Sequence, residues 1–564
     1  MKDKQANRRI RLLLAIFALV FAGTLARAVW LQGVQASSLG KMAERQHHET
    51  ITIPAGRGTI FDAAGVQLAI GETMTTVYAD PRQLTQPRAI AVAAQKFLGV
   101  NANSLYAQLL NRKSSFLYIK RFADPKAAAA FLKKGFVGVN SYPEEKRAYP
   151  QRSVASQVIG FAGTDNKGLG GLEVRYDRNL TGKTGKQTIV RDPFGRAINV
   201  LSMTPEQQGH DIFTTIDSKI QANAEQVLQQ TIRQWHAKSA TAIVLDPHTG
   251  AVIAMAQAPG YDANNSSRVP QALLTNHAVT DVFEPGSVFK VVTVAGALTE
   301  GLVTPDSNFV LPSCIQVADK CIHDAEKRAT ETMSVAKILS YSSNVGAITI
   351  AEKLGASQLM NWIDRFGFGK TTGLDFPGES VGIVPSYPTQ WSGTTIGNVP
   401  IGQGIAVTPI QIAAAYAAIA NGGVWIQPHL VDRVGGRTLH GFKRRRVVSP
   451  AVDQELKTML TGVVDEHGAT GNAAQIPGYT VAGKTGTAQI PGSHGYTTGK
   501  YVASFVGMVP VKSPRLVVLV SVEEPHGQIY GGTVAAPAFA EIAKFDLQYL
   551  GVPPDAPVTS TTTP

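Results

Sequence analysis

Cysteine is scarce in this chain: only Cys314 and Cys321 occur in 564 residues. Two cysteines exclude a disulfide-framework protein, and no spacing of Cys and His resembles that of a zinc site, so we expect no metal. Charged residues make up a low 17%, whereas hydrophobic residues make up 44%. This balance excludes a mainly disordered chain. The length exceeds what one hydrophobic core supports, so we expect two or three domains.

Acidic residues are outnumbered, because 41 Asp and Glu stand against 53 Lys and Arg, a formal charge of +12. Such a balance makes nucleic acid the first candidate partner. The N-terminus argues against it. Residues 1–11, MKDKQANRRIR, carry five basic side chains and one acidic one, and the uncharged apolar run Leu12–Ala26 follows them.

The apolar run extends to Leu31 if Arg27 is accommodated, which approaches the roughly 20 residues of a membrane-spanning helix. Arg27 can snorkel towards lipid headgroups, and Trp30 suits the same interface. Because a positive flank stays inside, the sequence predicts a cytoplasmic tail (1–11), a single transmembrane anchor in the cytoplasmic membrane (12–34) and an extracytoplasmic remainder. A cleaved signal peptide is the alternative, since residues 26–28 form an A-x-A-like site, but the apolar run continues past it.

The outer part keeps a charge of +8, and outside the cytoplasm we expect no nucleic-acid partner. Lipid headgroups or another anionic polymer suit this basic surface better. The sharpest basic cluster, Lys443–Arg446, is interpreted as a solvated loop. Cys314 and Cys321, seven positions apart, either close a small loop as a disulfide or remain free thiols.

Residues 35–230 contain patterns of both helices and strands, and many residues typical of turns. Residues 57–71 are typical of strand–turn–strand, 89–100 and 124–135 of helices, and 168–187 of a helix that ends in a glycine-rich loop. No constellation of chemically active side chains is evident. We therefore interpret this region as a mixed α/β pedestal and interaction domain without a catalytic role.

Residues 231–550 have a different pattern, preceded by a helix at 218–237. Two strands at 241–257 precede a helical stretch from about 282 to 366 and a helix at 408–421. Three strand-like runs begin at Tyr479, Tyr501 and Arg515, and a helix at 536–550 closes the domain. Early strands, central helices and late strands predict an α+β fold with one antiparallel sheet. The tail 551–564 is predicted to be disordered.

Ser287 and Lys290 suggest nucleophilic catalysis. Both lie in EPGSVFKVV, where a Pro–Gly turn becomes a helix, and a spacing of three places them on one helix face. A serine hydroxyl needs a neighbouring base, and a desolvated lysine with a lowered pKa can be that base. Ser-x-x-Lys is weak evidence alone, because it recurs at Ser38 and at Ser334.

Two further motifs make the pattern specific. Ser342-Ser343-Asn344 is the only Ser-x-Asn in the chain and starts 55 residues after Ser287. Lys484-Thr485-Gly486-Thr487 starts 142 residues later on a predicted strand, where Gly486 lets a substrate backbone approach closely. A second Lys-Thr-Gly, at Lys183, lies before the catalytic pattern and is attributed to chance.

These three motifs in this order resemble those of penicillin-binding proteins and serine β-lactamases. Over nearly its whole length the chain is similar to class B penicillin-binding proteins, which are monofunctional peptidoglycan D,D-transpeptidases, and most similar to the division-specific, FtsI-like branch. Other segments share the likeness, among them RGTIFD, YDRNLTG, LDPHTGAVIAMAQAPGYD and YGGTVAAPAF. Ala63 and Ala64 replace a polar pair usual in the family, and the Cys314–Cys321 loop is not a family hallmark.

The resemblance implies a five-stranded antiparallel sheet flanked by helices, and it assigns roles to the motif residues. Ser287 would attack the penultimate D-alanine carbonyl of a stem peptide, Lys290 would accept its proton, and Ser342 would relay a proton to the leaving amine. Asn344 would hold Lys290 and the substrate amide, and Lys484 would supply positive potential and order Ser342. The hydroxyls of Thr485 and Thr487 would face the substrate carboxylate. Backbone N–H groups of Ser287 and Thr487 would form the oxyanion hole.

No metal or cofactor is implied. The implied partners are stem peptides ending in D-Ala-D-Ala, β-lactam antibiotics, an FtsW-like glycosyltransferase of the SEDS family and other divisome membrane proteins. The alternatives are an elongation-type class B transpeptidase, a membrane-anchored D,D-carboxypeptidase and a β-lactam-binding scaffold. A β-lactamase is disfavoured, because no Glu-x-x-Leu-Asn pattern lies between Asn344 and Lys484.

Overall fold

The structure, a computed structural model, describes residues 2–38, 48–191, 197–492 and 495–557. The chain divides into two compact units, one formed by residues 1–56 with 182–209 and the other by residues 57–181 with 210–564. Each unit is described by itself.

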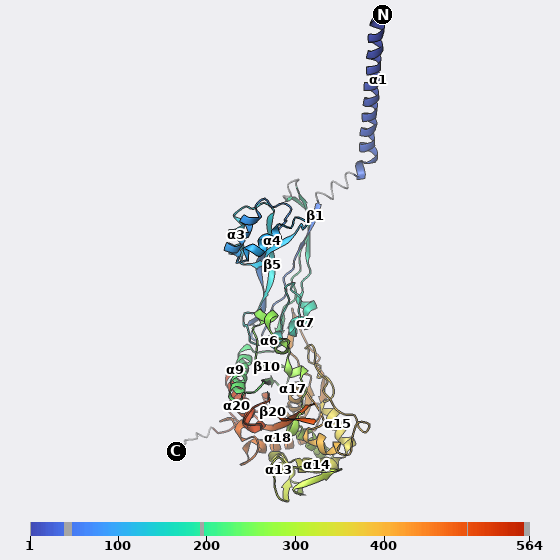
Figure 1. The fold of residues 1–564 in the computed structure, drawn as a ribbon. Helices are drawn as coiled ribbons and strands as arrows, with labels where there is room; N and C mark the ends of the chain where they lie inside the picture. The colour runs from blue at the N-terminus through green and yellow to red at the C-terminus, as the bar shows by residue number, and fades with distance from the viewer. Residues whose placement is uncertain (1, 39–47, 192–196, 493–494, 558–564) are drawn as a thin grey trace. The chain divides into compact units, whose positions relative to one another are not determined.

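The first unit contains the apolar helix and a small sheet (Figure 1). Helix α1 spans Lys2–Val29 and continues as one π-helical turn at Trp30–Val34. Its segment Asn7–Val34 has a mean hydropathy of 2.3 over its most apolar window, none of which is buried within the protein. The predicted apolar N-terminal helix is therefore confirmed. The sheet pairs its three strands antiparallel in the order β1-β6-β7: β1 His48–Ile53, β6 Gly185–Arg191 and β7 Ala197–Thr204.

The second unit begins with a mixed sheet of seven strands. Its order is β17-β16-β8-β2-β3-β4, with β5 also paired to β3, and the strands are β2 Ile60–Phe61, β3 Gln67–Ala79, β4 Leu117–Ala123, β5 Val139–Ala148, β8 Ile212–Thr214, β16 Val431–Val434 and β17 Arg437–Thr438. The predicted strand–turn–strand at 57–71 is confirmed: Asp62 Oδ1 accepts hydrogen bonds from the N–H groups of Ala64 and Val66 at 2.9 and 2.7 Å.

Helices cover one end of this sheet. They are α3 Pro87–Leu98, α4 Ala102–Leu109 and α5 Pro125–Leu132, and the shorter α6 Ser156–Ile159, α7 Gly171–Arg175 and α8 Asp177–Leu180 follow. Helices at 89–100 and 124–135 were expected, and α3 and α5 confirm them. Proline in the first turn starts each one, and Gly99 ends α3 in the left-handed conformation with φ 65°.

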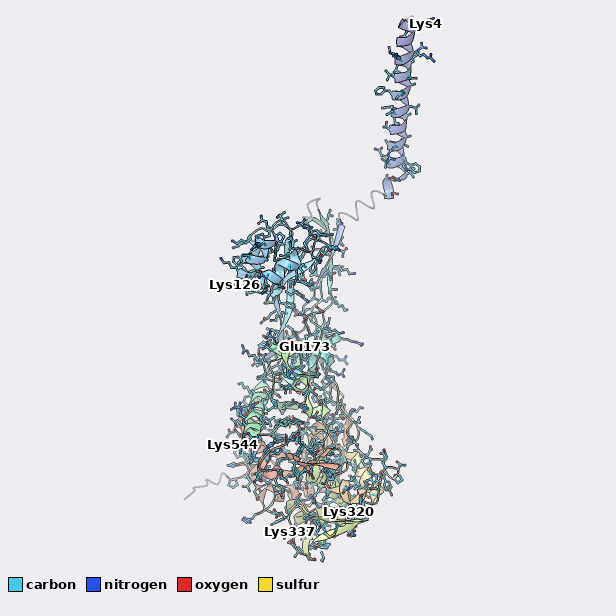
Figure 2. The ribbon with its side chains drawn as sticks, viewed as in Figure 1. Lys4, Lys126, Glu173, Lys320, Lys337 and Lys544 are labelled. Atoms are coloured by element: carbon cyan, nitrogen blue, oxygen red, sulfur yellow. A yellow bond between two sulfur atoms is a disulfide. The ribbon has the colours of Figure 1, made fainter. Side chains whose placement is uncertain are left out.

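A buried ion network near α7 was not foreseen from the sequence. Glu173 (Figure 2) is fully buried and accepts Arg57 Nε at 2.7 Å and Arg147 Nε at 2.6 Å. Arg57 also donates to Asp177 Oδ1 at 2.8 Å. One buried carboxylate thus joins the chain at residue 57, β5 and α7, and its loss would leave two buried guanidinium groups without that partner.

The second sheet has five strands in the order β10-β9-β21-β20-β19, antiparallel throughout. They are β9 Ser239–Leu245, β10 Val252–Ala258, β19 Ala482–Gly492, β20 Gly495–Val509 and β21 Leu516–Glu523. Two strands come before the helical region and three after it. The predicted α+β fold, with a five-stranded antiparallel sheet flanked by helices, is therefore confirmed.

Alternate residues of the central strand pack into two separate hydrophobic cores, one on each face of the sheet. Val518 and Val520 of β21 pack with helices α9 and α20 on one face, whereas Val517 and Leu519 pack on the other face in the core that includes α12 and α17. The helices of this region are α9 Ser218–Gln234, α10 Gln271–Leu274, α11 His277–Thr280, α12 Lys290–Thr299, α13 Val335–Ser340, α14 Asn344–Leu354, α15 Ala356–Phe366, α16 Thr395–Asn398, α17 Pro409–Ala420, α18 Pro450–Asp465, α19 Gly531–Val534 and α20 Ala536–Tyr549.

The expectation of a continuous helical stretch from 282 to 366 is wrong. Two small antiparallel strand pairs interrupt it: β11 Asn308–Leu311 with β14 Glu331–Ser334, and β12 Cys314–Val317 with β13 Lys320–His323. Short strands of this kind carry too few alternating positions to be recognised against a helical background. Cys314 and Cys321 are joined as a disulfide with a Cα–Cα distance of 5.7 Å.

Two predicted boundaries also change. The tail from residue 551 was expected to be disordered, but Asp555 Oδ1 accepts the N–H of Thr480 at 2.7 Å, and Tyr479 Oη donates to Val552 O at 2.7 Å. The expectation is wrong for residues 552–556, and residues 558–564 lie outside the described part. The predicted domain boundary at residue 230 falls inside α9, whose apolar face packs on the five-stranded sheet. We propose that the catalytic domain begins ahead of α9.

Candidate active site

Ser287 lies in a 3-10 turn, Gly286–Phe289, that leads directly into α12. Ser287 is half-buried, whereas Lys290 is fully buried at the start of the helix. Gly286 has a φ of +57°, and a Cβ there would lie 2.9 Å from Thr487 O and 3.4 Å from Thr487 N. A left-handed backbone with so close a neighbour requires glycine. The turn is therefore seated directly against the backbone of β19.

Lys290 brings the first two motifs together. Its Nζ donates to Asn344 Oδ1 at 2.7 Å, to Ser342 Oγ at 3.2 Å and to the carbonyl oxygen of Ser342. Ser342 has a φ of +58°, a conformation that is uncommon outside glycine and is often found at functional sites. In the described structure no hydrogen bond joins Lys290 Nζ to Ser287 Oγ, so the amine is held on the Ser342 side of the site.

Burial lowers the pKa of both lysines of the site. Desolvation lowers the pKa of Lys290 to about 7, although the negative charge of Asp324 acts to raise it. Burial also lowers the pKa of Lys484 well below its usual range, and a positive charge on Lys290 lowers it further. An amine with a pKa near neutrality is available both as a base and as an acid at physiological pH.

The third motif lies on β19, at the edge of the five-stranded sheet. A Cβ at Gly486 would lie 2.3 Å from Ser504 Oγ and 3.0 Å from Pro285 O, so the strand and the turn before Ser287 meet where only glycine fits. Lys484 Nζ bonds to Thr485 Oγ1 at 3.2 Å and Thr485 O at 3.4 Å, rather than to Ser342. The ordering of Ser342 by Lys484 remains a prediction.

Several residues that contact the motifs were not identified from the sequence. Thr470 Oγ1 accepts the hydroxyl of Thr485 at 2.9 Å, and the N–H of Gly531 donates to Thr487 Oγ1 at 3.1 Å. Glu284 accepts the N–H of Gly404 at 2.8 Å and the hydroxyl of Tyr496. Gly531 lies in the segment YGGTVAAPAF, whose family likeness was the only available indication of its importance.

Two of the repeated motifs make local structural contacts of their own. Ser334 caps the N-terminus of α13 by accepting the N–H of Lys337 at 3.2 Å, and the Lys337 ammonium pairs with Glu331 at 2.8 Å. Lys183 belongs to the first unit, where its backbone pairs with that of Gln207. The copies at Ser334 and Lys183 thus have local structural partners, and Lys41 of the copy at Ser38 lies outside the described residues.

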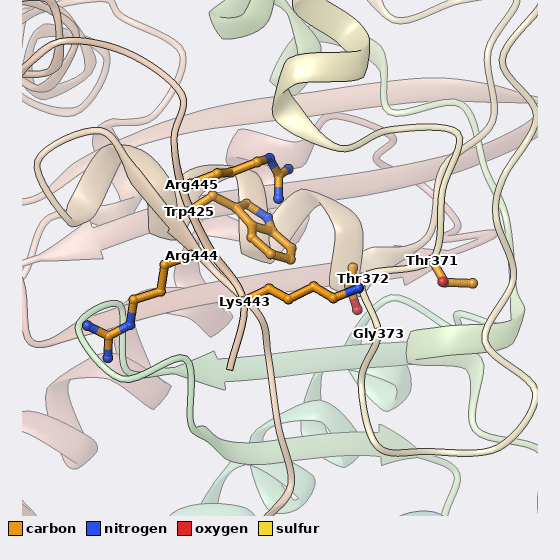
Figure 3. Close-up of a pocket in the computed structure, with 7 residues that line it drawn as sticks. All are labelled: Thr371, Thr372, Gly373, Trp425, Lys443, Arg444 and Arg445. Carbon is orange, nitrogen blue, oxygen red and sulfur yellow. The ribbon is translucent and has the colours of Figure 1, made fainter. Parts of the chain in front are cut away.

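The basic cluster Lys443–Arg446 is only partly a solvated loop, because residues 444–446 form strand β18 paired with β15 (Val424–Ile426). Arg445 lies 3.8 Å from the Trp425 ring centroid and donates to Arg365 O at 3.3 Å. Arg446 donates to the carbonyl of Gly422 at 2.9 Å. A hollow of about 460 Å³ beside the cluster is lined by Thr371, Thr372, Gly373, Trp425, Lys443, Arg444 and Arg445 (Figure 3). Figure 3 shows Lys443 reaching towards Thr372 and Arg444 pointing away from that loop.

Comparisons with known proteins agree with this geometry. Residues 240–544 match the family model of the penicillin-binding protein transpeptidase domain, and residues 52–214 match that of the penicillin-binding protein dimerisation domain. This chain belongs to the class B penicillin-binding proteins. It carries the family's transpeptidase domain, so the expectation of a serine-type transpeptidase is confirmed.

Relatives match this penicillin-binding protein over nearly its whole length. The peptidoglycan D,D-transpeptidase FtsI of Escherichia coli K12 is 32% identical, over 98% of this chain and 93% of its own. The probable peptidoglycan D,D-transpeptidase PenA of Neisseria meningitidis serogroup A is 31% identical, over 99% and 96%. A crystal structure of penicillin-binding protein 3 from Mycobacterium tuberculosis complexed with aztreonam has a TM-score of 0.71 and 30% identity, over 90% of this chain and 99% of its own.

Proposed function

We propose that this protein is a peptidoglycan D,D-transpeptidase that crosslinks stem peptides through an acyl-enzyme on Ser287. The proposal is carried by one observation above all: a fully buried Lys290 amine, with a pKa of about 7, is bonded to Ser342 and Asn344 beside the Ser287 turn. The names of the relatives support the substrate class, since the FtsI, PenA and PbpC proteins are peptidoglycan D,D-transpeptidases by name.

In the acylation step, Ser287 Oγ attacks the carbonyl carbon of the penultimate D-alanine, and Lys290 takes the hydroxyl proton. Backbone N–H groups of Ser287 and Thr487 stabilise the oxyanion, a role supported by the close approach of Gly286 to Thr487. The proton passes through Ser342 to the nitrogen of the terminal D-alanine, which leaves. An amine of a second stem peptide then attacks the ester, so that the peptide bond forms and Ser287 regains its proton.

The remaining motif residues bind the substrate. Asn344, held by Lys290, faces the substrate amide. Thr485 and Thr487 present hydroxyls to its terminal carboxylate, and Gly486 lets β19 lie close to the turn before Ser287. Burial lowers the pKa of Lys484, and a bound carboxylate would act in the opposite direction and favour its charged form.

The cellular role that we propose is septal cell-wall synthesis, with α1 as a single-pass anchor whose N-terminus is cytoplasmic and whose catalytic domain is extracytoplasmic. β-Lactams are the expected inhibitors, and an FtsW-like SEDS glycosyltransferase with other divisome proteins are the expected partners. An elongation-type role is the alternative. A relative named stage V sporulation protein D, from Bacillus subtilis, is also 32% identical, so identity alone does not separate the roles. A fluorescent fusion at midcell supports the septal role, whereas one along the side wall contradicts it.

The chemical proposal is tested by labelling with a fluorescent penicillin. Ser287→Ala should abolish covalent labelling, and Ser334→Ala, at the capping copy of the motif, should leave it intact. Release of D-alanine from a pentapeptide donor, with and without an acceptor amine, then separates crosslinking from simple carboxypeptidase action. Labelling that survives Ser287→Ala would contradict the assignment of the nucleophile.

The anchor is tested separately. Mature protein extracted from membranes should retain residues 1–34, and an external protease should cleave only beyond residue 34. N-terminal sequencing that starts near Val29 would instead identify a cleaved signal peptide.

A further inference from the structure

A disulfide-closed hairpin lies against the second catalytic motif. Strands β12 and β13 are joined by a two-residue turn, and Cys314 and Cys321 link one strand to the other. Cys321 is exposed, whereas Val317 is buried in a small cluster with Ala347 and Ile348 of α14. Ile315 and Ile322 are half-buried and pack against the same cluster, and the other side chains of the hairpin are exposed or half-buried. These few apolar contacts and the disulfide restrain the hairpin.

The end of this hairpin holds the Ser342-Ser343-Asn344 triplet through several bonds. The carbonyl oxygen of His323 accepts Asn344 Nδ2 at 3.0 Å. The carboxylate of Asp324 accepts the hydroxyl of Ser343 at 2.9 Å and the N–H of Val345 at 2.9 Å. These bonds fix the amide whose other end, Asn344 Oδ1, accepts the Lys290 ammonium.

Arg328 closes the arrangement from the other side. It pairs with Asp324 and donates to Ser343 Oγ at 2.9 Å. The middle serine of the motif is thus held between a carboxylate and a guanidinium, and both partners lie in the segment that follows β13. His323, the last residue of β13, and Asp324, the next residue, together contact all of the positions 343–345.

We propose that the disulfide-closed hairpin is a positioning element of the acylation step, and that reduction of Cys314–Cys321 slows acylation of Ser287. This inference rests on the proposed function. A dithiol breaks the S–S bond by thiol–disulfide exchange, leaves two protonated cysteines and is itself oxidised to a disulfide. The hairpin then loses its covalent restraint, and His323 and Asp324 hold Asn344 less firmly.

The first experiment measures acylation of the detergent-solubilised full chain by a fluorescent penicillin, before and after treatment with dithiothreitol. A chelator is present because the ligand atoms of Cys314, Cys321 and His323 lie within 4.8 Å of one another, and freed thiolates could take up zinc. Reduction should slow acylation roughly tenfold or more, since small misplacements of catalytic groups are costly. A Cys314→Ser/Cys321→Ser double variant should be slow with or without dithiothreitol.

The outcomes are distinct. An unchanged rate in protein whose two thiols are shown by alkylation mass to be free overturns the proposal. An equal slowing of the double variant by dithiothreitol also overturns it, because that effect cannot come from this disulfide. Absence of labelling in the oxidised wild-type protein would instead contradict the proposed function itself.

The second experiment tests positioning through Asp324→Asn, which preserves shape and removes charge. The charged groups that face Lys290 are Asp324 and Lys484. Because the Asp324 charge raises the pKa of Lys290, its removal should move the inflection of the rate–pH profile to lower pH and slow acylation above it. Asp319→Asn, at the exposed hairpin turn beside Lys320, is the matched control. It should change neither the acylation rate nor the pH of the inflection. A variant Asp324→Asn with wild-type rate and inflection overturns the proposal.

Discussion

The buried amine of Lys290 should make the acylation rate follow a titration curve. Its pKa is lowered from 10.5 to about 7 by desolvation. Only the neutral amine can accept the Ser287 proton. About one tenth of the molecules hold it at pH 6 and about nine tenths at pH 8, so the rate should rise roughly tenfold across that interval and then level off.

The assay is stopped-flow acylation by a fluorescent β-lactam from pH 5.5 to 9.5 at constant ionic strength. A lysine with an ordinary pKa would give a rate that is still rising tenfold per pH unit at pH 9. An inflection above pH 9, or a flat profile, would refute Lys290 as the base. Lys290→Arg provides the control, because a guanidinium cannot lose its proton, and it should cost about 10²–10⁴-fold at every pH.

The same lowered pKa has a cost in stability. Between about pH 7 and 10 the unfolded chain holds a proton on Lys290 that the folded chain lacks. The free energy of unfolding contributed by this group therefore rises with pH across that window, and it is least favourable below pH 7. Lys290→Met, which needs no proton at all, should remove this dependence and stabilise the protein against heat at pH 6.

Other predictions concern the remaining contacts. Glu173→Ala should cost about 3–5 kcal/mol in unfolding experiments, because two buried arginines lose their shared partner, whereas Asp165→Ala, whose side chain is 87% exposed, should cost little. Lys484→Ala should slow acylation about 10²-fold or more, and Lys183→Ala should leave the rate within about twofold; equal effects would mean that the site is misplaced. Gly286→Ala should disrupt the Ser287 turn and reduce labelling, because its Cβ would crowd Thr487 O; unchanged labelling would contradict that contact. The penicilloyl ester should persist for many minutes in intact-protein mass spectrometry, and multiple turnovers within seconds would identify a β-lactamase.

The sequence predicted the catalytic sheet because its strands are long and flanked by turns. Val518 and Val520 alternate with Val517 and Leu519 between two cores, which gives a short, valine-rich apolar run typical of a strand buried on both faces. The motifs were found because three short patterns in a fixed order are rarely coincidental. The contacts of Lys290 with Ser342 and Asn344 were an expectation that came from family likeness and not from spacing.

The supporting contacts could not be predicted, because they join residues that are distant in sequence or lie in weak local patterns. Glu173 and Arg57 are 116 positions apart, and their pairing depends on the sheet that brings them together. Strands β12 and β13 have four residues each, too few for a periodic pattern. Strand β16 joins the first sheet of the second unit from residues 431–434, so the predicted division at residue 230 does not match the pairing of strands.

The hydrogen bonds made by nearby carboxylates favour transfer of the acyl group to an amine over its hydrolysis. Rapid deacylation needs a carboxylate that is free to activate water. The carboxylate of Asp324 accepts hydrogen bonds from Ser343 and Val345 and pairs with Arg328. The carboxylate of Glu284 accepts hydrogen bonds from Gly404 and Tyr496. Both carboxylates thus serve to hold the motifs in place. In the proposed mechanism Lys290 is the base next to the ester, and an incoming amine, more nucleophilic than water, makes better use of it.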